Sequence, residues 1–160
     1  MQSERHTVTL YTVGHSNHEA GTFLALLHQY GIELVADVRS SPYSRYVPQA
    51  NRETLARALE AAGIAYRWLG DRLGGKPDGA VADYDELRQA SAFQAGLAAL
   101  LALAAERRVA VLCAEGDHRQ CHRGTLITPE LIAREVRVLH IQPDGSLVDA
   151  DDEPRQLALF

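Results

Sequence analysis

Segments with strand character alternate with helical segments along the chain, and this alternation constrains the fold more than any other feature. Strands are predicted where short runs are apolar and rich in β-branched side chains, over residues 7–13, 32–36, 64–68, 108–113 and 136–141. Helices are predicted between them, over 18–30, 52–62, 83–89 and 91–107. Strands that alternate with helices form βαβ units, so we expect a mainly parallel sheet covered by helices.

The remaining segments refine this outline. A further helix begins at Cys121, and Thr128 as a cap before Pro129 makes it either two short helices or one kinked helix. Residues 69–79 are rich in glycine and are expected to be a loop, and Leu147 and Val148 are expected to pair locally after a turn. The fold class predicted is α/β, a single-domain three-layer Rossmann-like fold with about five strands and helices on both faces.

Length and composition favour one soluble domain. The 160 residues suffice for one hydrophobic core, and 46% of them are hydrophobic. We expect residues 1–148 to form the domain and the acidic residues 149–160 to form a flexible tail that ends in an apolar docking peptide. No apolar run is long enough to span a membrane, and the first residues lack the apolar core of a signal peptide.

Charge and cysteine content bear on partners and compartment. The net charge of −5 argues against general attraction to nucleic acid, because the phosphate backbone repels an acidic surface. Two cysteines in a chain without a signal peptide predict reduced thiols and a cytoplasmic protein.

Polar side chains follow three of the predicted strands. The first strand leads into Gly14-His15-Ser16, the second into Asp37-Val38-Arg39-Ser40, and the fourth into Cys113-Ala114-Glu115. Because parallel strands end at the same edge of a sheet, and ligands bind at that edge, we expect the three segments to line one pocket.

The segment after the fourth strand concentrates reactive side chains. Glu115 is expected to be a desolvated carboxylate that acts as acid, base or nucleophile. Cys121 lies at a predicted helix start beside His122, a position that lowers a thiol pKa, whereas Cys113 ends an apolar strand and is interpreted as a core thiol.

The sequence contains no common metal or cofactor signature. A zinc site from both cysteines, His118 and His122 is conceivable, but the spacing matches no common zinc signature, so we predict no metal. The glycines near Lys76 form neither a P-loop nor a dinucleotide fingerprint, and no cofactor is predicted.

The candidate site residues divide into two groups by role. The predicted catalytic residues are His15, Asp37, Glu115, Cys121 and His122. The predicted substrate-binding residues combine hydroxyls, cations and glycines that let a ligand approach the backbone: Ser16, Arg39, Ser40, Gly74, Gly75, Lys76 and Arg123.

The last five residues carry a separate signal. They resemble the bacterial sliding-clamp-binding peptide, in which a glutamine precedes apolar residues that end in Leu-Phe. The residues that would contact the clamp are Gln156, Leu157, Leu159 and Phe160. The alternative is that this tail folds back on its own core.

Several of these segments together resemble a prokaryotic family of uncharacterised α/β proteins, domain of unknown function 488. The resemblance spans roughly residues 8 to 141 and departs from the family pattern at Pro129. It is carried by Gly14-His15-Ser16, Asp37-Val38-Arg39-Ser40, Tyr66 to Gly75, Leu112 to Glu115, Cys121-His122-Arg123 and Val138 to Ile141. It implies a single α/β domain and supplies no established activity.

The sequence is therefore compatible with three alternative functions. The first is a hydrolase-like enzyme of DNA repair or maintenance that acts on nucleic acid or another phosphate-bearing substrate, such as a nucleotide or a phosphorylated small molecule. The second is a non-catalytic adaptor that binds the same ligands. The third is a thiol-dependent enzyme or redox sensor that uses Cys121.

Overall fold

Six strands form one sheet in the computed structural model, which describes residues 8–75 and 83–153. The strand order is β3-β2-β4-β1-β5-β6, and β1 to β5 are mutually parallel, whereas β6 runs antiparallel to β5. Their bounds are β1 Thr9–Gly14, β2 Leu34–Asp37, β3 Ala65–Trp68, β4 Val109–Cys113, β5 Arg137–Ile141 and β6 Leu147–Asp149. The predicted mainly parallel α/β fold is confirmed.

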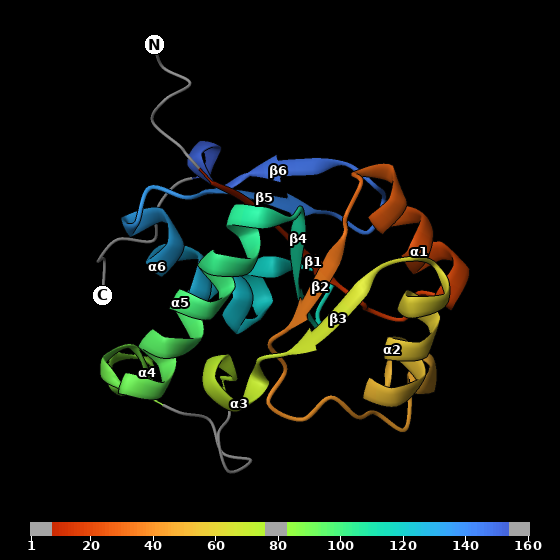
Figure 1. The fold of residues 1–160 in the computed structure, drawn as a ribbon, viewed down its shortest axis with the longest axis horizontal. Coiled ribbons are helices and arrows are strands. Elements are labelled where there is room, and N and C mark those ends of the chain that lie inside the picture. The colour runs from red at the N-terminus through yellow and green to blue at the C-terminus, as the bar shows by residue number, and fades with distance from the viewer. Residues whose placement is uncertain (1–7, 76–82, 154–160) are drawn as a thin grey trace.

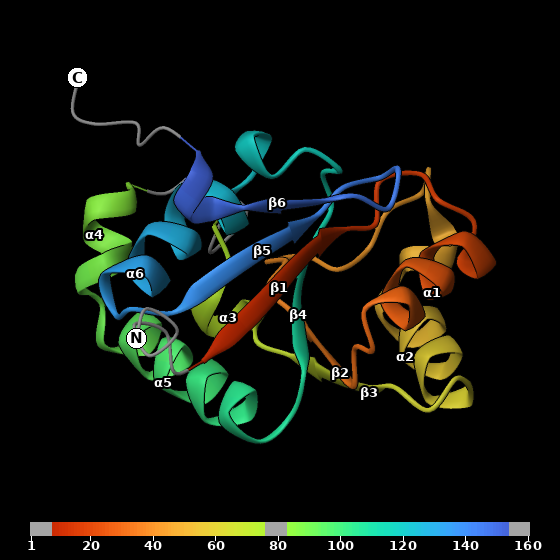
Figure 2. The same ribbon diagram turned by 90° about the horizontal axis from the view of Figure 1, so that it is seen from above.

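Helices cover both faces of the sheet (Figures 1 and 2). Their bounds are α1 Ala20–Gln29, α2 Arg52–Ala61, α3 Gly70–Leu73, α4 Tyr84–Gln89, α5 Ser91–Glu106 and α6 Thr128–Ala133. Short 3-10 turns lie at η2 Pro48–Ala50, η4 His118–Gln120 and η6 Ala150–Asp152, and a π-helical turn, η5, at Arg123–Ile127. Within the described ranges, no helix has both the length and the apolar character that crossing a membrane requires.

Two hydrophobic cores separate the layers. On one face, α1 and α2 bury Phe23, Leu27 and Leu59 against the sheet, and on the other, α5 and α6 bury Phe93 and Leu131. Every residue of β4 is buried, as expected for a central parallel strand covered on both sides. Apolar burial on both faces therefore explains why β4 shows no polar alternation in the sequence.

The topology places a switch point at the carboxyl end of β4. The chain leaves β1 and β2 toward α1 and α2 on one face, and it leaves β4 toward η5 and α6 on the other (Figure 2). Because β4 lies between β1 and β2, the chain turns to opposite faces of the sheet after neighbouring strands: to one face after β1 and β2, and to the other after β4. Ligands of open α/β sheets bind at such switch points.

Two local predictions were wrong. Residues 70–73 form the short helix α3 inside the expected loop, because Gly70 and Leu73 are buried against the domain. Thr128 does not cap a new helix, since η5 runs into α6 with helical backbone angles throughout. Its hydroxyl instead donates a hydrogen bond to the carbonyl of Arg123.

The beginning of the expected tail belongs to the folded domain. Asp149 lies in β6 and pairs with Arg137 at 3.0 Å, and Ala150 packs into the core, so residues 149–153 are not a free linker. The acidic composition misled the prediction because these carboxylates cap the turn η6 and pair with neighbours. The predicted docking residues 156–160 lie outside the described residues.

Candidate functional site

The loops after β1 and β2 are joined to the end of β4 by backbone hydrogen bonds. The amide of His15 donates to the carbonyl of Cys113 at 3.0 Å, and the amide of Val38 donates to the carbonyl of Leu112 at 3.0 Å. The pKa of His15 consequently responds to the charges of Arg39, Asp37 and Cys113. The predicted convergence of the three strand ends is therefore present in the structure.

Cys113 and His122 form a thiol–imidazole pair at the carboxyl end of β4. The Nδ1 atom of His122 lies 3.8 Å from the Cys113 sulfur, and its Nε2 atom lies 3.0 Å from the carbonyl oxygen of Val38. A carbonyl oxygen only accepts hydrogen bonds, so Nε2 carries the proton in the neutral ring. The lone pair of Nδ1 therefore faces the thiol, in the position of a general base.

A fully buried guanidinium lies beside this pair. Arg123 is 0% exposed, and it donates hydrogen bonds to the Thr12 hydroxyl and to the carbonyls of Glu115 and Gly116 at 3.0 and 3.1 Å. None of the carboxylates in the described ranges forms an ion pair with it. A buried cation needs a counter-charge, and the nearby cysteine thiols can provide one as a thiolate.

The two cysteines differ in acidity, in the direction opposite to the one expected from the sequence. A hydrogen bond from the Cys121 thiol, together with His122 and Arg123, holds the pKa of Cys113 well below the ordinary thiol value despite burial. The same hydrogen bond and burial raise the pKa of Cys121. These directions favour the thiolate on Cys113, with the Cys121 thiol as its hydrogen-bond donor.

The side chain of Glu115 does not fulfil the prediction of a desolvated carboxylate, because it is exposed. Its backbone faces the site instead, since the carbonyl accepts a hydrogen bond from Arg123 and packs on β1. A Cβ atom at Gly14 would lie 1.7 Å from this carbonyl oxygen, so the close approach requires glycine. Sequence position alone could not separate the roles of side chain and backbone.

Asp37 and Arg39 form a buried ion pair at the carboxyl end of β2. Arg39 donates from Nε and Nη2 to the two carboxylate oxygens at 2.9 and 2.8 Å, and its amide donates a third bond at 3.1 Å. The Tyr66 hydroxyl donates a fourth, and burial together with this carboxylate raises the pKa of Tyr66. With four donors on the carboxylate, Asp37 is suited to positioning Arg39 rather than to moving protons.

His15 and Ser16 form the tight turn after β1. Burial lowers the pKa of His15, and its Nδ1 lies 2.7 Å from the carbonyl of Ser16, so Nε2 of the neutral ring is an acceptor. Ser16 adopts a positive φ of 49°, which places the turn beside Gly116. His15 also borders a small apolar cavity beneath α1 and α2 with Phe23 and Leu55.

The glycines after α3 pack against His122 and Ser40. A Cβ atom at Gly75 would lie 2.9 Å from Cγ of His122, and one at Gly74 would lie 2.2 Å from Oγ of Ser40. These glycines therefore allow the segment to press on His122 and Ser40, which is a packing role. Lys76 lies outside the described residues.

Alanine at position 75 is expected to displace His122 from Cys113 and to slow the reaction of that thiol by about tenfold, because small misplacements of a base are costly. The rate of modification by methyl methanethiosulfonate, followed by mass spectrometry, measures this effect. Gly21→Ala is the matched control, since a Cβ atom there meets nothing within 4 Å. Equal rates in both variants would contradict the packing role.

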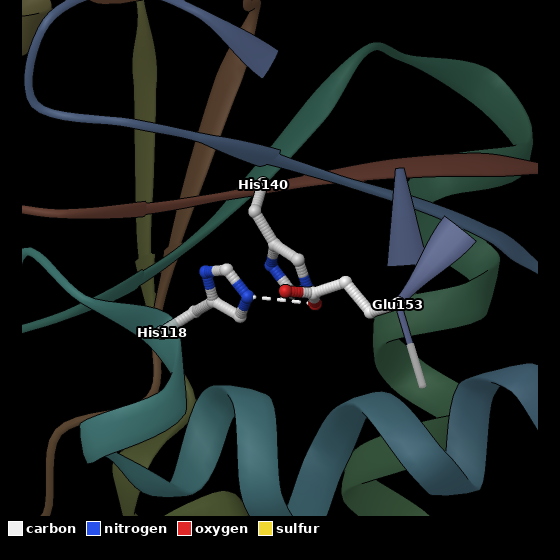
Figure 3. Close-up of side chains that lie close together, drawn as sticks. All are labelled: His118, His140 and Glu153. Atoms are coloured by element: carbon white, nitrogen blue, oxygen red, sulfur yellow. Dashed lines mark hydrogen bonds and ion pairs between the residues drawn. The ribbon is translucent and has the colours of Figure 1, made fainter. Parts of the chain in front are cut away.

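Among the described residues, the two cysteines do not form a cluster with His118 and His122 that could hold a metal ion. His118 is 3% exposed and lies with His140 and Glu153: its Nε2 is 2.8 Å from the Glu153 carboxylate, and its ring stacks on His140 at 3.6 Å (Figure 3). Sequence reasoning missed Glu153 because it assigned that residue to the tail. It gave His140 no role because that residue sits inside an apolar strand.

Fold and site together define a parallel α/β protein with a thiol–imidazole pair at the carboxyl edge of its sheet. The chain belongs to the family described as Domain of unknown function DUF488, whose model matches residues 19–128. No curated protein and no solved structure matches it. The function must therefore be argued from the site.

Proposed function

We propose that this protein is a thiol-dependent enzyme in which Cys113 is the nucleophile and His122 is its general base. The observation that carries the proposal is the sequence of contacts from the Val38 carbonyl through Nε2 and Nδ1 of His122 to the Cys113 sulfur. Nucleophile, base and orienting acceptor are the three parts of an activated nucleophile. Both cysteines are free thiols, as this chemistry requires.

The roles of the neighbouring residues follow from their contacts. Nδ1 of His122 removes the thiol proton, and the Val38 carbonyl holds the resulting imidazolium through its Nε2 proton. The Arg123 guanidinium and the Cys121 thiol stabilise the thiolate. The thiolate then attacks an electrophilic centre of the substrate and displaces a leaving group, which takes its proton from the His122 imidazolium. Water hydrolyses the covalent adduct and restores the Cys113 thiol.

Adduct mapping tests this proposal. The full chain would be incubated with a panel of disulfides, thioesters and phosphate esters, and intact mass spectrometry followed by peptide mapping would locate any covalent intermediate. The proposal expects an adduct on Cys113 and consumption of the reactive panel member. Ligands that bind and are recovered unchanged, with no adduct on Cys113, would favour the non-catalytic adaptor.

A nucleic-acid or other phosphate-bearing substrate is the second candidate, and an exposed aromatic loop favours it. Tyr46 and Tyr43 are 85% and 54% exposed, and Arg45 between them is exposed as well. Single-stranded nucleic acid binds by stacking bases on aromatic side chains beside cations. The loop leaves the carboxyl end of β2, so it lies at the edge of the sheet that carries Cys113.

The C-terminal peptide supports a DNA-associated role, and we propose that residues 156–160 dock on a bacterial sliding clamp. Micromolar binding of the full chain to a purified clamp is expected, and calorimetry should show its loss in a chain that lacks Gln156–Phe160. Replacing Leu159 and Phe160 by alanine should reproduce the loss, whereas Asp152→Asn should not. Binding that survives the truncation would assign the contact to another surface.

A further inference from the structure

We propose a second site, a binding site for a divalent transition-metal ion of the zinc class, formed by His118, His140 and Glu153. The three residues come from η4, β5 and the segment after η6, and the fold brings them together (Figure 3). One ligand atom from each lies within 4.8 Å of the other two. This site shares no residue with the Cys113–His122 pair and does not depend on the proposed thiol chemistry.

His140 contributes a buried nitrogen that has no hydrogen-bond partner. Its side chain is 0% exposed, and its Nε2 is buried without a hydrogen-bond partner. Its Nδ1 lies 2.6 Å from the Thr12 hydroxyl oxygen, which can accept the Nδ1 proton and leave a lone pair on Nε2. Buried polar atoms without partners are rare, and a metal ion would provide the missing partner.

His118 and Glu153 complete the donor set. The His118 Nε2 lies 2.8 Å from Oε1 of Glu153, so the imidazole and the carboxylate already face each other. Its Nδ1 lies 3.4 Å from the side-chain amide nitrogen of Gln142, which donates a hydrogen bond to it, so Nε2 carries the ring proton and donates to Glu153. A metal ion at Nε2 would take the place of this proton, as metal ions do when they bind an imidazole.

The donor chemistry indicates the class of ion. Two imidazole nitrogens and one carboxylate oxygen bind zinc-class ions and leave a fourth tetrahedral position for water. The rings of His118 and His140 are now stacked at 3.6 Å with 7° between their planes. Because the nitrogen lone pairs lie in the ring planes, both rings bind one ion only after they turn out of this stack.

Access and charge are compatible with such an ion. The Glu153 side chain is 28% exposed, so it connects the buried imidazoles to solvent. Its carboxylate contributes a negative charge next to both rings. The buried cation Arg123 contacts the Thr12 hydroxyl, on the Nδ1 side of His140 rather than the Nε2 side.

Titration of the metal-free full chain with Zn²⁺ by calorimetry tests this site. One ion should bind per chain with a dissociation constant at or below the micromolar range, and Glu153→Gln should weaken binding at least tenfold. Asp152→Asn, an exposed neighbour with the same charge change, should bind as the wild type does. His118→Gln provides a second ligand deletion should Glu153→Gln fail to fold.

A double variant with serine at Cys113 and Cys121 separates this site from the thiols, and it should retain the full stoichiometry. Three results would overturn the proposal. They are the absence of one-to-one binding, equal affinity in wild type and both ligand deletions, and loss of binding in the double serine variant, which would place the ion on sulfur.

Discussion

Serine in place of Cys113 is expected to slow the reaction of the protein with methyl methanethiosulfonate by at least about 100-fold, because a base-activated thiolate is lost. A small reagent is required, since Cys113 is only 5% exposed. His122→Gln should slow the same reaction by about tenfold or more, as it removes the base at 3.8 Å while it leaves the thiol in place.

Cys121→Ser is the matched control, because a serine hydroxyl still donates a hydrogen bond to the Cys113 sulfur. Its overall rate of modification should stay within a few-fold of the wild type.

The rate of modification of the wild type should depend only weakly on pH. A lowered pKa of Cys113 keeps its thiolate populated as the pH falls from 9 to 6, whereas an ordinary thiol becomes protonated over this range. A fast reaction that follows Cys121 instead would refute the assignment.

Arg123→Met is expected to have the largest effect on stability, lowering the free energy of unfolding by about 3 kcal/mol. Methionine has a similar length, so packing is largely retained. The carbonyl oxygens of Glu115 and Gly116 and the hydroxyl of Thr12, however, lose a donor inside the protein. Urea denaturation, monitored by circular dichroism, measures the loss.

Arg119→Met is the control for this substitution. The Arg119 side chain is 72% exposed, and its ion pair with Asp117 is solvated, so its removal should leave the urea midpoint unchanged. The Arg123 variant should also raise the pKa of Cys113, because a cation near the thiolate is gone. If Arg123→Met is as stable as the wild type, the hydrogen bonds from Arg123 to Glu115 and Gly116 do not stabilise the segment after β4.

Most of the fold could be predicted because its signals are local. Hydrophobic periodicity predicted α1, and alanine and leucine content predicted α5. Gly31 and Gly63, with φ of 66° and 80°, follow the ends of α1 and α2. The helix α3 was missed because burial against the rest of the chain, rather than local propensity, stabilises it. The turn η6 was missed because the acidic composition of residues 149–153 was interpreted as a free tail.

The site could be predicted in outline but not in detail. Parallel-sheet geometry placed His15, Asp37 and Cys113 at one edge, since it depends only on strand direction. Which thiol is acidic depends on the contacts of His122 with Val38 and Cys113, which are 84 and 9 residues away along the chain. No spacing rule reports such contacts, and the stacking of His118 on His140 was hidden for the same reason.

A pH titration of thiolate absorbance in the ultraviolet tests most directly whether Cys113 is the activated nucleophile, because it requires no reagent to reach the buried sulfur. The account predicts one thiolate per chain at pH 6 in the wild type and in Cys121→Ser, and none in Cys113→Ser. Absorbance that rises only above pH 8, or that persists at pH 6 in Cys113→Ser, would contradict Cys113 as the activated nucleophile.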